Sequence, residues 1–258
     1  MPKKAQITLF IILGIVIVTA ALIVVYVKSN LIKTTEGETR DIIKQPYTSA
    51  NVKLFVESCL DISANKGITL LGMRGGFIEF PADVNTMVTS RTIIPFLYYR
   101  GENKLPSLIV IGEELSKYVS HEMIVCLDNF NEFKRMGYNI ETGDISTITN
   151  ISDFSVVIKV DYPILIKDEE GVTKISEFYK QIPLKLGKIH KLASEIMAES
   201  EEYDSFTVLI PELDFDTQLP YDYYPIAEET FLWIIQDDTS MRETYSFMFG
   251  TKYKRQLP

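Results

Sequence analysis

The longest apolar stretch of the chain lies near its start. From Ala5 to Val27 there is no charged residue, and 19 of the 23 positions are apolar. The part from Ile7 onward has 21 residues, which span about 30 Å as an α-helix, the thickness of the hydrocarbon core of a bilayer. The pattern therefore predicts a transmembrane helix within residues 1–27.

The pattern changes after this run. Residues 28–48 are polar and include Gly37 and Pro46, which predicts a stalk. Ser49 is a suitable N-cap for a helix that ends at Gly75-Gly76. The buried face of this helix is expected to hold Val52, Phe55, Val56, Cys59 and Ile62.

Two further helices are expected in the rest of the chain. Helical spacing of apolar residues extends from Leu108 to Arg135, and Gly137 is placed to end that helix. A shorter amphipathic helix has five apolar residues on one face, which are Leu186, Ile189, Ala193, Ile196 and Met197.

Alternating apolar and polar residues between and after these helices predict strands. The alternation is clearest from Phe154 to Tyr162, and it is followed by a turn at 168–171 and a strand over 172–184. Short strands are also expected at 77–80, at 85–106 and in a hairpin formed by 231–235 and 245–253. The sequence thus predicts an α+β domain over 49–258, with two main helices, one short helix and a mainly antiparallel sheet.

Composition and charge exclude several classes of protein. The net charge is −9, hydrophobic residues make up 46% of the chain, and only one segment is long enough to cross a membrane. These values exclude a polytopic membrane protein, a disordered chain, a collagen and a basic nucleic-acid-binding protein. No nucleic-acid partner and no cofactor are therefore expected.

The residues before the apolar run carry a resemblance. Lys3-Lys4-Ala5-Gln6-Ile7-Thr8-Leu9-Phe10 resembles the class III signal peptides of archaeal type IV pilin-like proteins, although many members have glutamate where this chain has Phe10. The resemblance implies cleavage between Ala5 and Gln6, with the helix retained as an anchor. The later segments 55–60, 74–78 and 161–163 resemble single-pass membrane proteins of small-genome archaea, which implies no activity.

Two other outcomes for the N-terminal segment remain open. The segment is an uncleaved anchor, or a secretory signal is removed after Ala20, although the apolar run continues beyond that point. Basic residues flank the run on both sides, so the positive-inside rule hardly decides the orientation. We expect a single-pass protein of the cell membrane with an external C-terminal domain.

Cys59 and Cys126 are the only cysteines, and each lies in a Cys-Leu-Asp tripeptide on the apolar side of a predicted helix. In an external domain this even number predicts a disulfide that joins the two helices. The alternative is two separate buried thiols. A zinc site that includes His121 and His190 is not expected, because no pair of ligands has the spacing of a zinc motif.

The most unusual polar segment is acidic. Thirteen acidic residues and one basic residue lie between Glu199 and Glu243, together with eight aromatic residues. The segment is expected either to bind a basic protein partner, Ca²⁺ or a sugar, or to form a solvated face with its aromatic rings turned inward. The candidate residues for this acidic interaction surface are Asp214, Asp216, Asp222, Glu228 and Glu229.

Asn150-Ile151-Ser152 is a glycosylation sequon in a segment expected to form a turn, and it is usable only on an external domain. Together these patterns predict a membrane-anchored envelope protein with a structural or protein-interaction role, such as a pilin-like surface subunit. The alternatives are an envelope hydrolase that uses two carboxylates and an accessory subunit of a membrane complex. We expect no enzymatic activity, and we expect self-association or a protein partner at the acidic surface.

Overall fold

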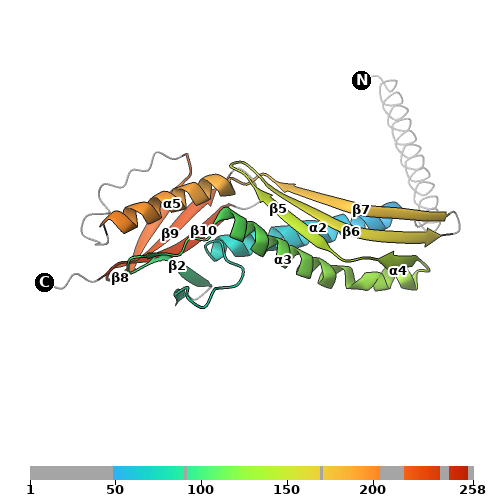
Figure 1. Cartoon of the computed structure of the whole chain (residues 1–258), viewed down its shortest axis with the longest axis horizontal. Helices are drawn as coiled ribbons and strands as arrows, with labels where there is room; N and C mark the ends of the chain where they lie inside the picture. The colour runs from blue at the N-terminus through green and yellow to red at the C-terminus, as the bar shows by residue number, and fades with distance from the viewer. Residues whose placement is uncertain (1–48, 90–91, 169–170, 204–217, 239–243, 255–258) are drawn as a thin grey trace, which may run out of the picture. The chain divides into compact units, whose positions relative to one another are not determined.

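The computed structural model describes residues 49–89, 92–168, 171–203, 218–238 and 244–254. Ser49–Pro258 forms one compact unit of helices and two β-sheets (Figure 1), which confirms the predicted α+β class. The expected transmembrane helix and stalk fall within residues 1–48 and lie outside the described residues. No helix in the described ranges combines the length and the apolar content needed to cross a membrane.

Two long helices pack against each other along much of their length. They are α2 (Ser49–Met73) and α3 (Leu108–Leu127). Gly67 allows their close approach, because a Cβ atom at this position would lie 2.6 Å from Cδ1 of Leu115. The predicted stripe on α2 is buried at Val52, Val56 and Cys59, but Ile62 is 46% exposed and does not belong to it.

The single helix expected from Leu108 to Arg135 is wrong after Leu127. α3 ends at Leu127, and Asp128, Asn129 and Phe130 have φ angles of 42°, 51° and 57°. These left-handed conformations cannot continue an α-helix. A short 3₁₀ turn, η2 (Asp128–Phe130), and α4 (Asn131–Arg135) follow, and Gly137 with φ 98° ends this region as expected.

The first sheet has four antiparallel strands. They are β4 (Asn139–Thr142), β5 (Ser146–Ile151), β6 (Val156–Asp168) and β7 (Gly171–Ile182). β6 pairs with β7 along one edge and with both β5 and β4 along the other. The alternation predicted for residues 154–162 is confirmed from Val156 onward, since Val156, Ile158 and Val160 are fully buried on the side that faces the long helices. Phe154, which was expected on the same face, precedes the strand and is 63% exposed.

The second sheet has six strands. They are β1 (Thr86–Val88), β2 (Ile93–Tyr99), β3 (Glu102–Asn103), β8 (Tyr221–Ala227), β9 (Thr230–Asp237) and β10 (Tyr245–Lys252). The order is β1-β2-β10-β9-β8, with β3 paired to β2. The predicted hairpin is formed by β9 and β10, but β10 is parallel to β2, a pairing that the sequence did not indicate.

α5 (Leu186–Tyr203) is the predicted short helix, and it lies beside the second sheet (Figure 1). The hydroxyl groups of Ser200 on α5 and Tyr253 after β10 lie 2.9 Å apart in a buried hydrogen bond. Both sheets and the three main helices contribute to one connected cluster of buried apolar side chains. The two sheets and their helices therefore share a hydrophobic core.

The strand expected at Phe77–Phe80 is not formed. α2 is followed by a turn in which Gly75 and Gly76 have φ angles of 55° and 94°, and the N–H of Gly76 bonds to the carbonyl of Leu71 at 2.8 Å. Phe77 and Ile78 are buried, but they are not part of a strand. Burial of apolar side chains, rather than strand pairing, explains the apolar pattern that suggested a strand.

Candidate functional site: a groove between α3 and β5

The predicted disulfide is confirmed. Cys59 on α2 and Cys126 on α3 are joined with a Cα–Cα distance of 5.8 Å. Each cysteine belongs to one of the two long helices, so the bond fixes the α2–α3 pair covalently close to the point where α3 ends. The cysteines therefore have a structural role, and they leave no free thiol in the chain.

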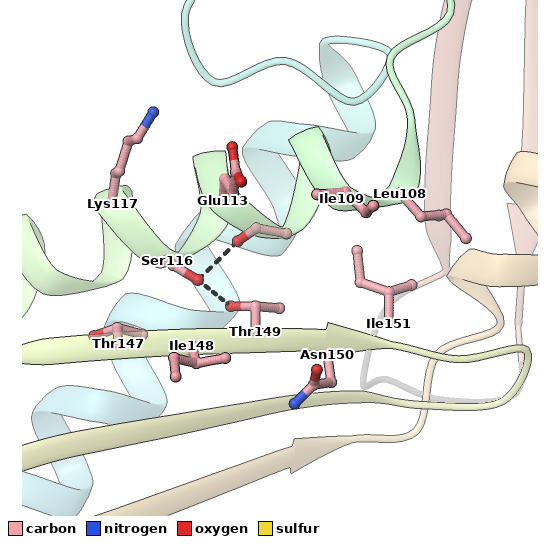
Figure 2. Close-up of a pocket in the computed structure, with 11 residues that line it drawn as sticks. Leu108, Ile109, Glu113, Ser116, Lys117, Thr147, Ile148, Thr149, Asn150 and Ile151 are labelled. Atoms are coloured by element: carbon pink, nitrogen blue, oxygen red, sulfur yellow. Dashed lines mark hydrogen bonds between the residues drawn. The ribbon is translucent and has the colours of Figure 1, made fainter.

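A groove of about 530 Å³ runs between the first half of α3 and strand β5 (Figure 2). One wall is formed by residues 147–151 of β5, and the other is formed by Leu108, Ile109, Gly112, Glu113, Ser116 and Lys117 of α3. Figure 2 shows Glu113 and Lys117 pointing away from β5, whereas Ile151 points toward Leu108. The charged ends of the side chains thus lie outside the space between helix and strand.

Small residues set the distance between the two walls. A Cβ atom at Gly112 would lie 3.0 Å from the carbonyl oxygen of Thr149, so the helix backbone closely approaches the strand backbone. Two pairs of hydroxyl groups join the walls: Ser116 Oγ lies 2.9 Å from Thr149 Oγ1, and Ser120 Oγ lies 2.8 Å from Thr147 Oγ1. Hydrogen bonds between side-chain hydroxyl groups thus join α3 directly to β5.

β5 is an edge strand whose free side faces α3, and a covering helix is one of the ways in which a sheet edge is protected from further pairing. It pairs with β6 on one side only, and its six residues include no charged residue and no proline. The other long edges differ, because β7 carries Lys174, Glu177 and Lys180, and β8 carries Asp222 and Pro225. Charges and prolines at edges discourage the addition of another strand. β5 lacks these residues, and α3 lies against it instead.

The groove also exposes apolar surface. Ile109 on α3 is 74% exposed, and Ile148 on β5 is 58% exposed. The hydroxyl groups between the walls already bond to one another, and the groove includes no histidine. The groove therefore offers apolar surface, which suits binding rather than proton transfer.

Asn150 lies on β5 and not in a turn, which corrects the expectation for the sequon. It is opposite Val157 of β6, its side chain is exposed, and it forms part of the groove wall. The turn begins two residues later. There, Ser152 Oγ accepts the N–H of Ser155 at 3.0 Å and donates to the Ser155 carbonyl at 2.9 Å. The sequon thus combines an exposed strand residue with a turn residue.

The candidate acidic surface is only partly within the described residues. Asp214 and Asp216 lie outside them, as do Ala5 and Gln6 of the predicted processing site. Asp222 and Glu228 are exposed near opposite ends of β8, about 20 Å apart at the rise of a strand. Glu229 is half-buried with φ 59° in the turn to β9. The structure therefore does not gather the described acidic candidates into one site.

Some aromatic residues of that segment are turned inward, as the alternative interpretation expected, but Tyr224 is 49% exposed, and Phe206 and Phe215 lie outside the described residues. The rings of Tyr223 and Trp233 lie 5.3 Å apart across β8 and β9, and the rings of Trp233 and Phe249 are stacked at 6.3 Å. Trp233 is 1% exposed, and its indole N–H donates to Thr251 Oγ1 at 3.1 Å. These rings form core and are not available to a sugar.

The histidines and a lysine cluster do not form a second site. No group of three or more potential metal ligands occurs within the described ranges. His121 is exposed, and a ring nitrogen of His190 lies 2.9 Å from the carbonyl oxygen of Pro106. A smaller hollow near α5 contains lysines that contact other groups: Lys188 lies over the ring of Phe154, and Lys191 pairs with Glu195.

Ion pairs shift the pKa of two exposed carboxyl groups. The hydrogen bond from Lys104 lowers the pKa of Asp83. The hydroxyl of Tyr179 and the ammonium group of Lys159 lower the pKa of Glu177. A general acid in a hydrolase needs a raised carboxyl pKa, so neither residue suits that role.

The groove was not predicted from the sequence, although its strand wall carries a local signal. The segment Ser146-Thr147-Ile148-Thr149-Asn150-Ile151 is rich in β-branched residues and alternates in character, which is typical of a strand. Its place at an edge depends on how the sheet is assembled, and that was not visible from the segment itself.

Comparison of the chain with protein-family models, with curated proteins and with solved structures found no match.

Proposed function

We propose that the chain is a membrane-anchored protein of the cell envelope whose Ser49–Pro258 unit is external and has a structural or protein-interaction role. The observation that carries the proposal is the Cys59–Cys126 disulfide. Disulfides form and persist in oxidising compartments, and they are rare where glutathione and thioredoxin keep thiols reduced. An external location accounts for a cross-link between two helices that already share a core.

The membrane anchor in this proposal is a helix over Ile7–Val27. Its support is the sequence: 21 residues without a charge, preceded by Lys3 and Lys4. The anchor leads through residues 28–48 to α2, which is disulfide-linked ten residues after its start at Ser49. This order suits a domain held at a membrane surface by one segment.

A pilin-like surface subunit is the specific form of this proposal. It is supported by the resemblance of residues 3–10 to class III signal peptides, which implies a mature chain that begins at Gln6. The groove between α3 and β5, with the exposed side chains of Ile109 and Ile148, supplies a surface for contact. We infer a protein-interaction role because the groove offers apolar surface for binding.

Trapping of thiols in intact cells tests the external location. Cells are quenched in acid, and the denatured full-length chain is treated with a maleimide reagent of high mass before and after reduction. We expect no shift before reduction and a shift of two labels afterwards. Labelling of both cysteines before reduction would show reduced thiols in the cell and would contradict the proposal.

Processing and anchoring are tested on the same material. We expect the chain in the membrane fraction after a carbonate wash, and a variant that lacks residues 5–27 in the soluble fraction. A pilin-like subunit also requires a mature N-terminus at Gln6 and recovery in sheared filaments. Recovery only in membranes with Met1 or Pro2 at the N-terminus would exclude the pilin-like form, and it would leave the envelope location in place.

A further inference from the structure

We propose that a second copy of this chain packs against the outer face of the second sheet, so that the protein is a two-fold symmetric dimer. The outer face is the side of β8, β9 and β10 that carries Tyr224, Leu232, Ile234 and Met248. The inference goes beyond the proposed function, because it depends neither on the external location nor on the groove beside β5.

Strand β9 is apolar on both of its sides. Phe231, Trp233 and Ile235 are buried in the shared core. Leu232 and Ile234 alternate with them and therefore point to the other side of the sheet, where they are only partly buried and do not belong to that core. A strand with a continuous apolar run is typical of a sheet that is covered on both faces. The outer face thus has the composition of a covered surface.

The apolar residues of the outer face are neighbours across three strands. Tyr224 of β8 lies opposite Leu232, and Ile234 lies opposite Met248 of β10. Tyr224 is 49% exposed, and Met248 is partly exposed. A contiguous exposed apolar surface marks an interaction site, and tyrosine and methionine are enriched in protein interfaces.

The open face of the first sheet has a different character. There Lys159 pairs with Glu177 at 3.0 Å, and Lys167 pairs with Glu141 at 2.5 Å. Charged groups that bond to one another across strands are compatible with a solvated face. The same chain therefore presents one sheet face suited to water and one suited to a partner.

Two charged residues lie at diagonal corners of the outer face. Asp222 of β8 is opposite Ile234, and Lys252 of β10 is opposite Thr230. Ile234 and Thr230 are about 13 Å apart at the rise of a strand, with Leu232 midway between them. Neither Asp222 nor Lys252 forms an ion pair with another residue of the described ranges.

This arrangement of charges is complementary to itself. A two-fold axis that passes through Leu232 in the plane of the interface, perpendicular to the line from Asp222 to Lys252, places each Asp222 opposite Lys252 of the other copy. The strands of the two sheets then cross at a steep angle, as in orthogonal sheet packing. A second copy therefore supplies an apolar cover and two ion pairs, with the same surface used on both sides.

Exchange of these charges tests the pairing. The full-length chain is purified in mild detergent, and its sedimentation is followed over a range of concentrations, where we expect two chains per particle for the wild type. Asp222→Lys and Lys252→Asp each place like charges opposite one another, so each is expected to raise the dissociation constant at least about tenfold. An equal mixture of the two variants, and the variant that carries both changes, are expected to restore the dimer. Failure of both to do so would overturn the paired arrangement.

A lysine within the apolar surface tests the face itself. Ile234→Lys is expected to raise the dissociation constant at least about 100-fold, because the dimer would bury an unpaired charge. Ile148→Lys is the matched control, since Ile148 is a 58% exposed strand residue of the first sheet, and it should leave the dimer intact. Dissociation by Ile148→Lys but not by Ile234→Lys would assign the contact to the groove and overturn the inference.

Cross-linking in membranes identifies what lies on the face. Both native cysteines are held in the disulfide, so Leu232→Cys introduces a free thiol close to the proposed axis. A short bismaleimide is expected to join two copies of this variant. A cross-link to a different protein, or a wild type that sediments as a single chain at every concentration, would overturn the dimer. Either result leaves the external location standing, because that location is tested by the state of the native thiols.

Discussion

The carboxylate of Asp237 accepts the backbone N–H of Lys185 at 2.8 Å, although 52 positions separate the two residues. Asp237 is the last residue of β9, and its side chain is fully buried. Lys185 lies in the connection from β7 of the first sheet to α5, which lies beside the second sheet. The bond therefore fixes the place where the chain passes from one sheet to the other.

Replacing this carboxylate is expected to weaken the fold. Asp237→Ala leaves the partly buried N–H of Lys185 without its acceptor, which lowers the free energy of unfolding by about 2 kcal/mol. The measurement is urea unfolding of the 49–258 unit and of its variants. Asp238→Ala is the matched control, because Asp238 is the exposed neighbour, and we expect it to change stability by less than about 0.5 kcal/mol. Equal stabilities of the two variants would contradict the assignment.

Tyr245 differs from Asp237 in hydrogen bonding, because its buried hydroxyl has no hydrogen-bond partner within the described residues. Removing a buried polar group without a partner is neutral or favourable. Tyr245→Phe is therefore expected to keep or raise the free energy of unfolding, by up to about 1 kcal/mol. Thermal unfolding at pH 7 measures this change. A clear loss of stability would show that the hydroxyl has a bonding role.

The same residue predicts a dependence of stability on alkaline pH. Burial, together with the charge of Asp237, raises the pKa of Tyr245 above its ordinary value of 10.0. The folded state thus holds this proton more tightly than the unfolded state. The contribution of Tyr245 to the free energy of unfolding is complete below about pH 10. Above that pH the contribution is lost by about 1.4 kcal/mol per pH unit.

Tyr245→Phe removes this alkaline slope, whereas Tyr224→Phe, at an exposed tyrosine of β8, leaves it unchanged. Urea unfolding between pH 8 and pH 11 gives the two slopes. The same slope in both variants would assign the alkaline loss to other groups.

Gly72 is expected to be intolerant of a side chain although it lies near the end of a helix. A Cβ atom there would lie 2.5 Å from the carbonyl oxygen of Ser246, a backbone atom of β10. Alanine gains about 1 kcal/mol in helix propensity but loses up to about 3 kcal/mol to overpacking. Gly72→Ala is thus expected to lower the free energy of unfolding by about 2 kcal/mol.

Gly143→Ala is the control for this change. A Cβ atom at Gly143 would meet only the ring of Pro163 at an ordinary contact distance of 3.4 Å. We expect its melting temperature to stay within about 2 °C of the wild type. A Gly72→Ala variant as stable as Gly143→Ala would show that α2 and β10 separate easily.

The disulfide is expected to contribute strongly to stability. It joins residues 67 positions apart, and the chain-entropy model gives about 4 kcal/mol for a loop of this length. Guanidinium unfolding with and without reductant measures the difference, and the Cys59→Ala, Cys126→Ala double variant should be insensitive to reductant. A wild type unaffected by complete reduction would show that the helix pair is held by packing alone.

Local patterns predicted most of the helices and strands. Helical spacing identified α2, α3 and α5, and strict alternation identified the centre of β6. The disulfide followed from two cysteines on the apolar faces of helices. These features depend on residues a few positions apart, which the sequence places on one face without any knowledge of tertiary structure.

Features that depend on distant partners were not predicted. The break after Leu127 depends on burial of Phe130 against Phe55 and Tyr162, whose ring centroids lie 6.1 Å and 6.3 Å away. No local pattern predicts this break, because Asp128 and Asn129 are compatible with a helix. The parallel pairing of β10 with β2 and the groove beside β5 arise in the same way from sheet assembly.

The position of the disulfide also determines how the chain would respond to a mechanical load. A force applied between Ser49 and the last strand would enter α2 and pass directly from Cys59 to Cys126 through the covalent bond. The 67-residue separation between them, about 230 Å of extended chain, would carry no tension. An oxidised domain held by its N-terminal side would therefore extend less than a reduced one, and the difference would be set by a single bond.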